Sequence, residues 1–276
     1  MNRPGYNPTR RNRKIGTAAQ GHGQNNRLVI PDVYQGKQDM IEDVDSPSFV
    51  EIAIAGELRT FVVERTREDS MHPCTVDDVA TVLGMIAPRD LEGLKLIIFR
   101  QPTRKQATIS PVWGRLRYFM EIGRHRGAAL ILEAGASKGA LQRFPRKMLV
   151  DDEAELERFR ANGQTIIEDR RSISVVLDMT AQREVQLFRT VLHEIGHQVD
   201  YLEKVERPSD AEDSEWSDLW DRYWQRPSRE REVFAHAYAD RVGTALRSEG
   251  RIPFSRTDGE ERLLGLGLRP SDFHAA

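Results

Sequence analysis

The sequence has 276 residues, of which 39% are hydrophobic and 30% are charged, and its formal net charge is −2 at pH 7. This length and composition allow a sizeable core in one large domain or two small ones. The nearly balanced charge argues against a protein dominated by nucleic-acid binding. No apolar run approaches the roughly 20 residues that span a bilayer, so we expect no membrane partner.

Cys74 is the single cysteine, which excludes an internal disulfide and a cysteine-based zinc site. We expect it to be a small buried residue.

The N-terminal segment, residues 1–27, carries several basic side chains and no acidic one. With Gly, Asn and Pro between them, this composition predicts a disordered basic tail. An arm that binds nucleic acid or directs targeting is the less favoured alternative. No apolar segment follows the basic residues, so no secretory signal is predicted. We therefore expect a cytoplasmic protein, or one exported by a route that needs no signal peptide.

Apolar and β-branched runs predict most of the strands in the first two thirds of the chain. Strands are predicted at 49–56, at 58–65, at 91–101, at 172–179 and, as a pair joined by the turn 123–127, within 112–134. Residues 28–70 are otherwise poorly assigned and are interpreted as an extension of the domain.

Two helices are predicted among these strands. The first covers residues 75–86, with Thr75 as a plausible N-cap and Asp78 at the capping-box position. The second is the charged segment 151–163, which ends at a glycine. After the last strand the chain is predicted to be helical. Strands first and helices second indicate the α+β class.

A long helix is predicted at about 181–204, directly after Thr180, because apolar residues recur there with a 3.6-residue period. The apolar stripe, which we expect to pack against the sheet, consists of Phe188, Leu192, Ile195, Val199 and Leu202.

The opposite side of this helix carries the segment "TVLHEIGHQVDY", in which two histidines stand one helical turn apart. At that spacing His193 and His197 can both reach one metal ion at about 2.0–2.1 Å. Glu194 points away from the side of the helix that carries the two histidines, so it would not be a ligand but would contact a water bound to the ion. Asp200 would orient a histidine ring, or would be an ordinary surface residue. The competing interpretation is an amphipathic helix with two exposed histidines.

A catalytic zinc site needs a third protein ligand. We expect it to come from a second predicted helix at 228–246, which follows the motif helix in the chain. Its candidate donors are Glu230, Glu232, His236 and Asp240. Glu232 is preferred because it lies on the side that carries small and apolar residues, which we expect to face inward. His236, one turn later, would support a ligand, donate a proton, or in a rival assignment replace Glu232 as the ligand.

The segments "HEIGHQVDY" and "EREVFAHAY" together resemble the gluzincin zinc metallopeptidases, and within them the anthrax-lethal-factor-like group. That group has the pattern His-Glu-x-Gly-His-x-x-Asp followed by Glu-x-x-Phe-Ala. The matching positions are His193, Glu194, Gly196, His197, Asp200, Glu232, Phe234 and Ala235. The match is specific over roughly residues 185–245. Before residue 185, the chain resembles the family only in the placement of its segments.

The resemblance implies a zincin-like metallopeptidase domain over residues 28–276 and a Zn²⁺ ion held by His193, His197 and Glu232. It implies a zinc-dependent endopeptidase in which Glu194 is the general base for attack by water on a peptide bond.

One departure from the family concerns the residue that polarises the substrate carbonyl. The family has a tyrosine seven residues before the glutamate ligand, whereas position 225 here is Gln225. Tyr223 would serve if the loop is shifted, and Tyr238 and His236 are the other candidates.

Peptidases of this kind bind a protein or peptide substrate as an extended strand, and residues 112–120 are the candidate sheet edge. An ordinary core strand is the equally favoured alternative for this segment. An aromatic stripe over 216–224 is predicted to pack in the core between the two ligand helices. The alternative to an enzyme is a catalytically inactive, metallopeptidase-like binding module, in which the basic tail engages a partner. The presence of Glu194 argues against it, because a binding module has no use for a general base.

Overall fold

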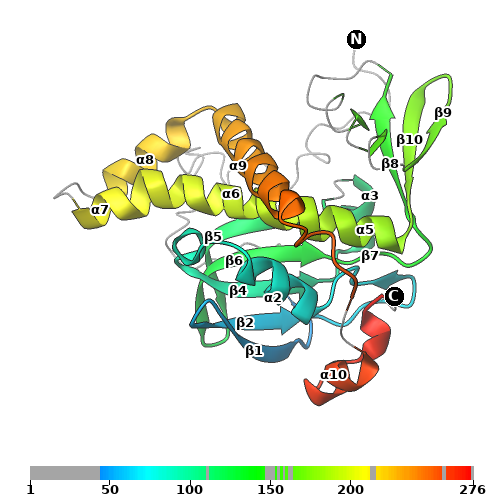
Figure 1. Ribbon diagram of the computed structural model, residues 1–276, viewed down its shortest axis with the longest axis horizontal. Coiled ribbons are helices and arrows are strands. Elements are labelled where there is room, and N and C mark those ends of the chain that lie inside the picture. The colour runs from blue at the N-terminus through cyan, green and yellow to red at the C-terminus, as the bar shows by residue number, and fades with distance from the viewer. Residues whose placement is uncertain are drawn as a thin grey trace, which may run out of the picture. The chain divides into compact units, whose positions relative to one another are not determined.

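The computed structural model describes most of the chain from Val44 to His274, and this part belongs to one compact unit (Figure 1). The described ranges are 44–109, 112–146, 164–211, 216–256 and 259–274, with a few positions between 153 and 160. The predicted basic tail, residues 28–43 and most of the predicted helix at 151–163 lie outside these ranges.

The main sheet has five strands in the order β1-β2-β4-β6-β5. They are β1 (Ser48–Ile54), β2 (Glu57–Val63), β4 (Leu94–Arg100), β5 (Gly114–Ile122) and β6 (His125–Glu133). The pairs β2/β4 and β4/β6 are parallel, whereas β1/β2 and β5/β6 are antiparallel. All the strands predicted in this part of the chain are confirmed. The poorly assigned extension supplies two of them, so its second half is an integral part of the sheet.

The central strand β4 shows why its sequence, "LKLIIFR", is almost continuously apolar. Ile97 and Phe99 point into the larger core on one face of the sheet, while Leu96 and Ile98 point into a smaller core on the other. A strand that is covered on both faces needs apolar residues at successive positions.

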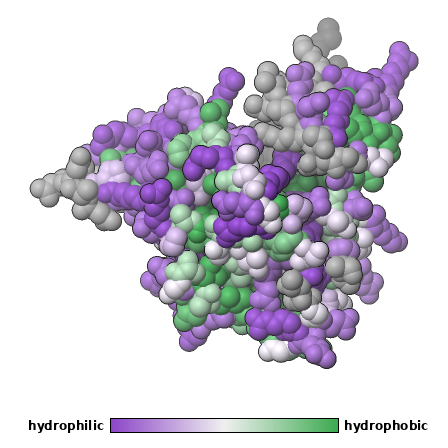
Figure 2. Space-filling view, viewed as in Figure 1, coloured by the Kyte–Doolittle hydropathy of each residue, from purple (hydrophilic) through white to green (hydrophobic). Residues whose placement is uncertain are grey.

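Two smaller sheets complete the β structure. One has the order β8-β10-β9, with β8 at Ala140–Pro145, β9 at Thr165–Glu168 and β10 at Ser172–Leu177. The other pairs β3 (Ser70–Met71) with β7 (Gly135–Ala136). The predicted strand at 172–179 is confirmed as β10, whereas β8 and β9 were not predicted. In Figure 2, apolar side chains gather on the surface over the β8-β10-β9 sheet, and hydrophilic ones cover α7 and α8.

The short helix α2 (Val76–Gly84) is confirmed together with its cap. The Thr75 side chain accepts from the Asp78 N–H at 3.1 Å, and the Asp78 carboxylate accepts from the Thr75 N–H at 3.0 Å. This reciprocal pair satisfies two backbone donors that a helix start would otherwise leave unpaired. A 3₁₀ turn, η1 (Pro88–Leu91), and the helix α3 (Arg104–Ile109) lie on either side of β4 in the chain.

A continuous helical run crosses the main sheet (Figure 1). It consists of α5 (Met179–Val185), the π-helical turn η2 (Gln186–Thr190), α6 (Val191–Tyr201), the π-helical turn η3 (Leu202–Glu206) and α7 (Arg207–Ala211). The run begins two residues before the predicted start at 181, because Asp178 is the N-cap and accepts from the Ala181 N–H at 2.8 Å.

The later helices are α8 (Trp216–Gln225), α9 (Ser228–Ser248) and α10 (Glu260–Gly265), followed by the 3₁₀ turn η4 (Pro270–Asp272). Figure 1 shows α9 lying over α6 on the side away from the sheet. The fold is therefore α+β, a mixed sheet combined with helices. Among the described residues, no helix is both long enough and apolar enough to cross a membrane.

The predicted core residues of the long helix are buried. The apolar stripe Phe188, Leu192, Ile195, Val199 and Leu202 is at most 5% exposed. Cys74 is 0% exposed, as expected for a small core residue. The predicted aromatic stripe of α8 packs with Tyr201 and Val205 in a separate cluster, in which Tyr223 is 1% exposed. Trp224 is the exception, since 42% of its surface is exposed.

Candidate metal centre

Three side chains from two helices converge on one point. The Nε2 atoms of His193 and His197 are 3.1 Å apart. The two carboxylate oxygens of Glu232 lie 3.3 Å from the His193 Nε2 and 3.6 Å from the His197 Nε2. Within the part of the chain that the structure describes, these residues form the one group of three or more His, Cys, Asp or Glu side chains whose ligand atoms are close enough for a metal ion.

The three separations suit a tetrahedral zinc ion. Ligand atoms placed about 2.0–2.1 Å from a tetrahedral ion are separated from one another by about 3.3 Å. Two imidazoles and one carboxylate are also a donor set found in catalytic zinc sites, where the fourth position stays open. The residues present therefore fit a zinc ion in both chemistry and spacing.

The histidines are held by a helix that is buried on most sides. In α6, His193 and His197 are the only two residues that are not buried, and their side chains are 18% and 14% exposed. Sequence periodicity predicted one buried face and one open face. The structure differs because α9 and β5 pack against much of the second face, which leaves both histidine side chains only partly exposed.

The helix that carries Glu232 approaches α6 at Gly196. A Cβ atom added to Gly196 would lie 2.8 Å from both the Cα and the carbonyl oxygen of Ala235. Ala235 itself is 0% exposed. Contact between the two backbones at this point brings Glu232, one turn before Ala235, over the histidine rings. This contact gives a physical reason for the small residues at both positions.

The electrostatics of the group follow from its packing. Hydrogen bonds with the two imidazoles hold the pKa of the Glu232 carboxyl well below its usual range. Burial disfavours the charged form of His197, but the Glu232 and Glu194 carboxylates outweigh burial and raise its pKa. The second ring nitrogen of His193, Nδ1, is buried and has no hydrogen-bond partner among the described residues.

Glu194 lies beside this group and faces the edge of the main sheet. Its side chain is buried, and burial raises its pKa above the ordinary value, while the neighbouring imidazoles act in the opposite direction. The Leu116 backbone amide of β5 lies close enough to this carboxylate to oppose part of the rise in its pKa. Glu194 is thus positioned between the histidines and the sheet edge, as a general base would need to be.

The other candidate ligands have different surroundings. The His236 ring packs against the His193 ring with 4.4 Å between their centroids. Glu230 pairs with Arg226 at 3.4 Å. Neither residue belongs to the group of converging ligand atoms, and neither does Asp240. Among the described residues, the geometry therefore favours Glu232 over its rivals as the third donor.

The two candidate tyrosines have hydroxyl groups that bond elsewhere. The Tyr223 hydroxyl is 2.9 Å from the Tyr118 hydroxyl, and burial raises its pKa to about 12. The Tyr238 hydroxyl donates to Asp90 Oδ2 at 2.9 Å. Gln225, at the position where the family has a tyrosine, is exposed at the end of α8.

Asp200 has a partner that sequence reasoning missed. Its carboxylate is 0% exposed and accepts two hydrogen bonds from Arg226, at 2.9 and 3.2 Å. It is not the ordinary surface residue that was one of its two predicted roles. Arg226 stands in the short connection between α8 and α9, so this ion pair ties the start of the Glu232 helix to α6. No sequence spacing signals a pair of residues this far apart in the chain.

Comparison with known proteins finds no matching family model, no significantly similar curated protein and no significantly similar solved structure. Function is therefore inferred from the residues and their geometry.

Proposed function

We propose that the protein is a zinc-dependent endopeptidase of the gluzincin type with a zincin-like domain. The observation that carries the proposal is the convergence of His193, His197 and Glu232, whose ligand atoms lie 3.1–3.6 Å apart. Support for the zincin-like domain comes from the mixed sheet packed on the helix with the His-Glu-x-x-His motif and from the helical C-terminal part.

The roles of the ligands follow from the site. His193, His197 and Glu232 hold the ion, which when bound acts as a Lewis acid and lowers the pKa of a coordinated water. Glu194 accepts the proton of the attacking water and passes it to the leaving amine. Its buried position keeps bulk water from competing for that carboxylate.

The substrate is a protein or peptide in an extended conformation. Within the described part of the chain, β5 pairs only with β6, so its other edge has backbone groups that a substrate strand can use. The Leu116 N–H on that edge contacts Glu194. A strand added there passes next to the proposed general base. The proposal therefore gives residues 112–120 the substrate-edge role, one of the two roles predicted for them from the sequence.

His236 is the candidate best placed to stabilise charge on the substrate carbonyl. It is exposed and packs against the ring of a proposed ligand, whereas the Tyr223 and Tyr238 hydroxyls bond to Tyr118 and Asp90. A donor at this position is typically worth a few kcal/mol in the transition state. Both tyrosines stay as alternatives to be tested by substitution.

Metal content and proteolysis test the proposal together. We expect purified protein to contain one zinc per chain by elemental analysis, and Glu232→Gln and His197→Ala to lose it. Glu194→Gln should retain zinc and lose about 10²–10⁴-fold in peptide cleavage. Glu230→Gln, an exposed change on the same helix, is the matched control and should retain both zinc and activity.

Substrates are found by comparing new protein N-termini produced by wild type and by Glu194→Gln. If the protein holds no stoichiometric zinc and wild type produces no new N-terminus that Glu194→Gln does not also show, the enzyme proposal is lost. The inactive binding module then becomes the better account, and nucleic acid remains a partner only through the basic tail.

A further inference from the structure

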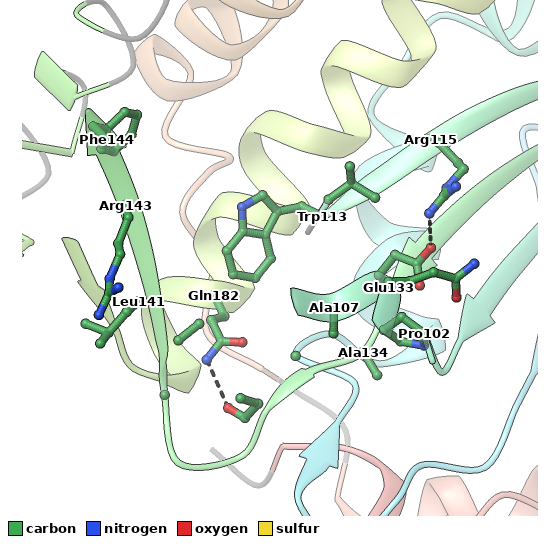
Figure 3. Close-up of a pocket in the computed structure, with 16 residues that line it drawn as sticks. Pro102, Ala107, Trp113, Arg115, Glu133, Ala134, Leu141, Arg143, Phe144 and Gln182 are labelled. Carbon is green, nitrogen blue, oxygen red and sulfur yellow. Dashed lines mark hydrogen bonds and ion pairs between the residues drawn. The ribbon is translucent and has the colours of Figure 1, made fainter. Parts of the chain in front are cut away.

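A pocket of about 720 Å³ lies at the beginning of the proposed substrate edge (Figure 3). It is formed by the start of β5, the end of β6, the turn into β8 and one residue of α5. Its lining does not include His193, His197 or Glu232. A pocket of this size falls within the range of about 300–1,000 Å³ that is usual for ligand sites.

Small residues keep the pocket open. Ala107, Ala134, Gly135, Ala136, Gly139 and Ala140 all contribute to its lining. At Gly135 an added Cβ would lie 1.9 Å from Gln182 Oε1, so a larger residue cannot stand there without displacing Gln182. Trp113 forms an aromatic wall (Figure 3). Val112 and Leu141, also in the lining, are 41% and 56% exposed. The lining is therefore suited to a bulky apolar group.

The charged groups of the lining are two arginines and one glutamate. Glu133 is its only acidic residue, and that carboxylate already accepts from Arg115 and from Arg100, a buried arginine at 3.0 Å. Arg143 is an exposed residue of β8 that makes no ion pair within 4.0 Å among the described residues, although its charge also acts on the exposed Asp169 carboxylate. With the charge of Glu133 balanced by its two arginines, Arg143 gives the pocket a positive potential that favours an acidic ligand.

A buried amide oxygen adds a hydrogen-bond acceptor. Gln182 lines the pocket and is 0% exposed. Its amide nitrogen donates to the Ala136 and Leu177 carbonyls, whereas Oε1 has no partner among the described residues. Buried polar atoms of this kind are normally paired, so an N–H group of an occupant would complete the site.

The pocket is next to the proposed catalytic residues along β5. Trp113 and Arg115 line it, and Leu116 contacts Glu194. Three residues of strand span about 10 Å. A substrate strand paired with β5 would therefore place a side chain in the pocket within about three residues of the bond beside Glu194.

We infer that this pocket selects substrates that carry a bulky apolar residue and an acidic residue two positions away, because alternate residues of an extended strand face the same side. The inference rests on the proposed function and names its substrate class. The apolar side chain fills the space beside Trp113, and the carboxylate two residues along the strand pairs with Arg143 at the rim.

Peptide binding to the Glu194→Gln protein tests the pocket without requiring catalysis. The probes are dye-labelled peptides of Ser, Thr and Ala with Phe-Ser-Asp, Phe-Ser-Lys or Ala-Ser-Asp at the centre, measured by fluorescence anisotropy. They are called the Phe-Asp, Phe-Lys and Ala-Asp peptides after the two residues that face the pocket. We expect the Phe-Asp peptide to bind about tenfold more tightly than either of the others. Equal binding of the three peptides, or no binding of Phe-Asp, would overturn the inference.

Two substitutions, each with a matched control, assign the preference to the pocket. Arg143→Glu should reverse the preference to Phe-Lys, whereas Arg126→Glu, an exposed change in the β5–β6 hairpin, should not. Ala107→Trp fills the pocket from an exposed helix position and should weaken Phe-Asp binding about tenfold. Ala245→Trp makes the same change on an exposed face of α9 and should have no effect. A change no larger than that of its control contradicts the inference.

Failure here is distinguishable from failure of the proposed function. If wild type contains zinc and cleaves peptides that Glu194→Gln does not, but Arg143→Glu leaves their preference unchanged, the enzyme stands and the pocket inference falls. If the peptides bind as expected and neither protein cleaves them, the pocket stands as a binding site and the enzyme falls.

Discussion

The two helices that form the candidate metal centre hold their ligands in different ways. In α6 almost every residue is buried, and the histidines project from a helix fixed by the sheet below and by α9 above. In α9 only Ala235, Tyr238, Gly243 and Leu246 are buried, and the Glu232 side chain is 53% exposed. The histidine pair is therefore part of the core, whereas the carboxylate is positioned by a few contacts between helices.

This difference shows where the site is most sensitive to change. Core packing holds His193 and His197 through many small contacts, so no single neighbour decides their position. Glu232 depends on the contact between Gly196 and Ala235 and on the ion pair between Asp200 and Arg226. Changes at these contacts should disturb the third ligand more than the first two, and the following substitutions measure by how much.

The largest effect is expected for Arg226→Ala. It leaves the fully buried Asp200 carboxylate without its partner, which typically costs about 3–5 kcal/mol of unfolding free energy. Urea unfolding of the metal-free protein measures this loss. Zinc affinity should fall as well, because the start of α9 is no longer tied to α6. Arg222→Ala, at an exposed position of α8, is the control and should change stability by less than about 0.5 kcal/mol. Equal effects of the two changes would mean that the ion pair does not hold α9.

Gly196→Ala should have the next largest effect. The added Cβ lies 2.8 Å from backbone atoms of Ala235, so the helices must separate. Overpacking of this kind costs about 1–3 kcal/mol, and the separation should weaken zinc binding at Glu232. Thermal unfolding and zinc titration measure the two effects.

The matched control for Gly196→Ala is Gly243→Ala, on α9. There the nearest atom is the end of the flexible Arg247 side chain, which can move away. Alanine is the better helix former by about 1 kcal/mol, so this change should be neutral or stabilising. A loss at Gly243 as large as that at Gly196 would mean that helix separation is not the cause.

Tyr223→Phe should have a smaller effect on stability and distinguishes a packing role from a catalytic one. Loss of the hydroxyl pair with Tyr118 should cost about 1 kcal/mol. Because that hydroxyl already has a partner, we expect kcat for peptide cleavage to stay within about threefold. A fall of about 10²-fold or more with the same stability would instead identify Tyr223 as the oxyanion donor.

The smallest effect is expected for Glu230→Gln. This carboxylate pairs with Arg226 on the exposed start of α9, and such helix pairs contribute about 0.3–0.5 kcal/mol. The loss should disappear in high salt, which screens exposed charges. Because Arg226 keeps its bond with Asp200, zinc affinity should not change. A change in zinc affinity would show that Glu230 also helps to position Glu232.

Sequence periodicity predicted much of the main sheet and of the candidate site. Strands and amphipathic helices have local repeats, so β4, α2, α6 and α9 could be assigned from their own residues. The same repeat placed His193, His197 and Glu232 on faces that meet.

Features that depend on distant contacts could not be predicted in this way. Nothing in the local pattern indicates that Asp200 pairs with Arg226, or that Leu116 contacts Glu194. The strands β8 and β9 are short, and their apolar residues pack against only a small core, so their pattern is weak. The start of α5 was predicted two residues late, because the apolar repeat does not show that Asp178 is the residue that caps the helix.

The π-helical turns on either side of α6 rotate the buried faces of α5 and α7 relative to that of α6. Such a turn holds one residue more than an α-helical turn, and each residue rotates a helix by about 100°. Ala181 and Val185 of α5 consequently join the core of the β8-β10-β9 sheet, while Leu192 and Ile195 of α6 join that of the main sheet. One continuous helical run therefore contributes residues to two hydrophobic cores. A single-residue deletion within η2 would turn one end of it away from its sheet.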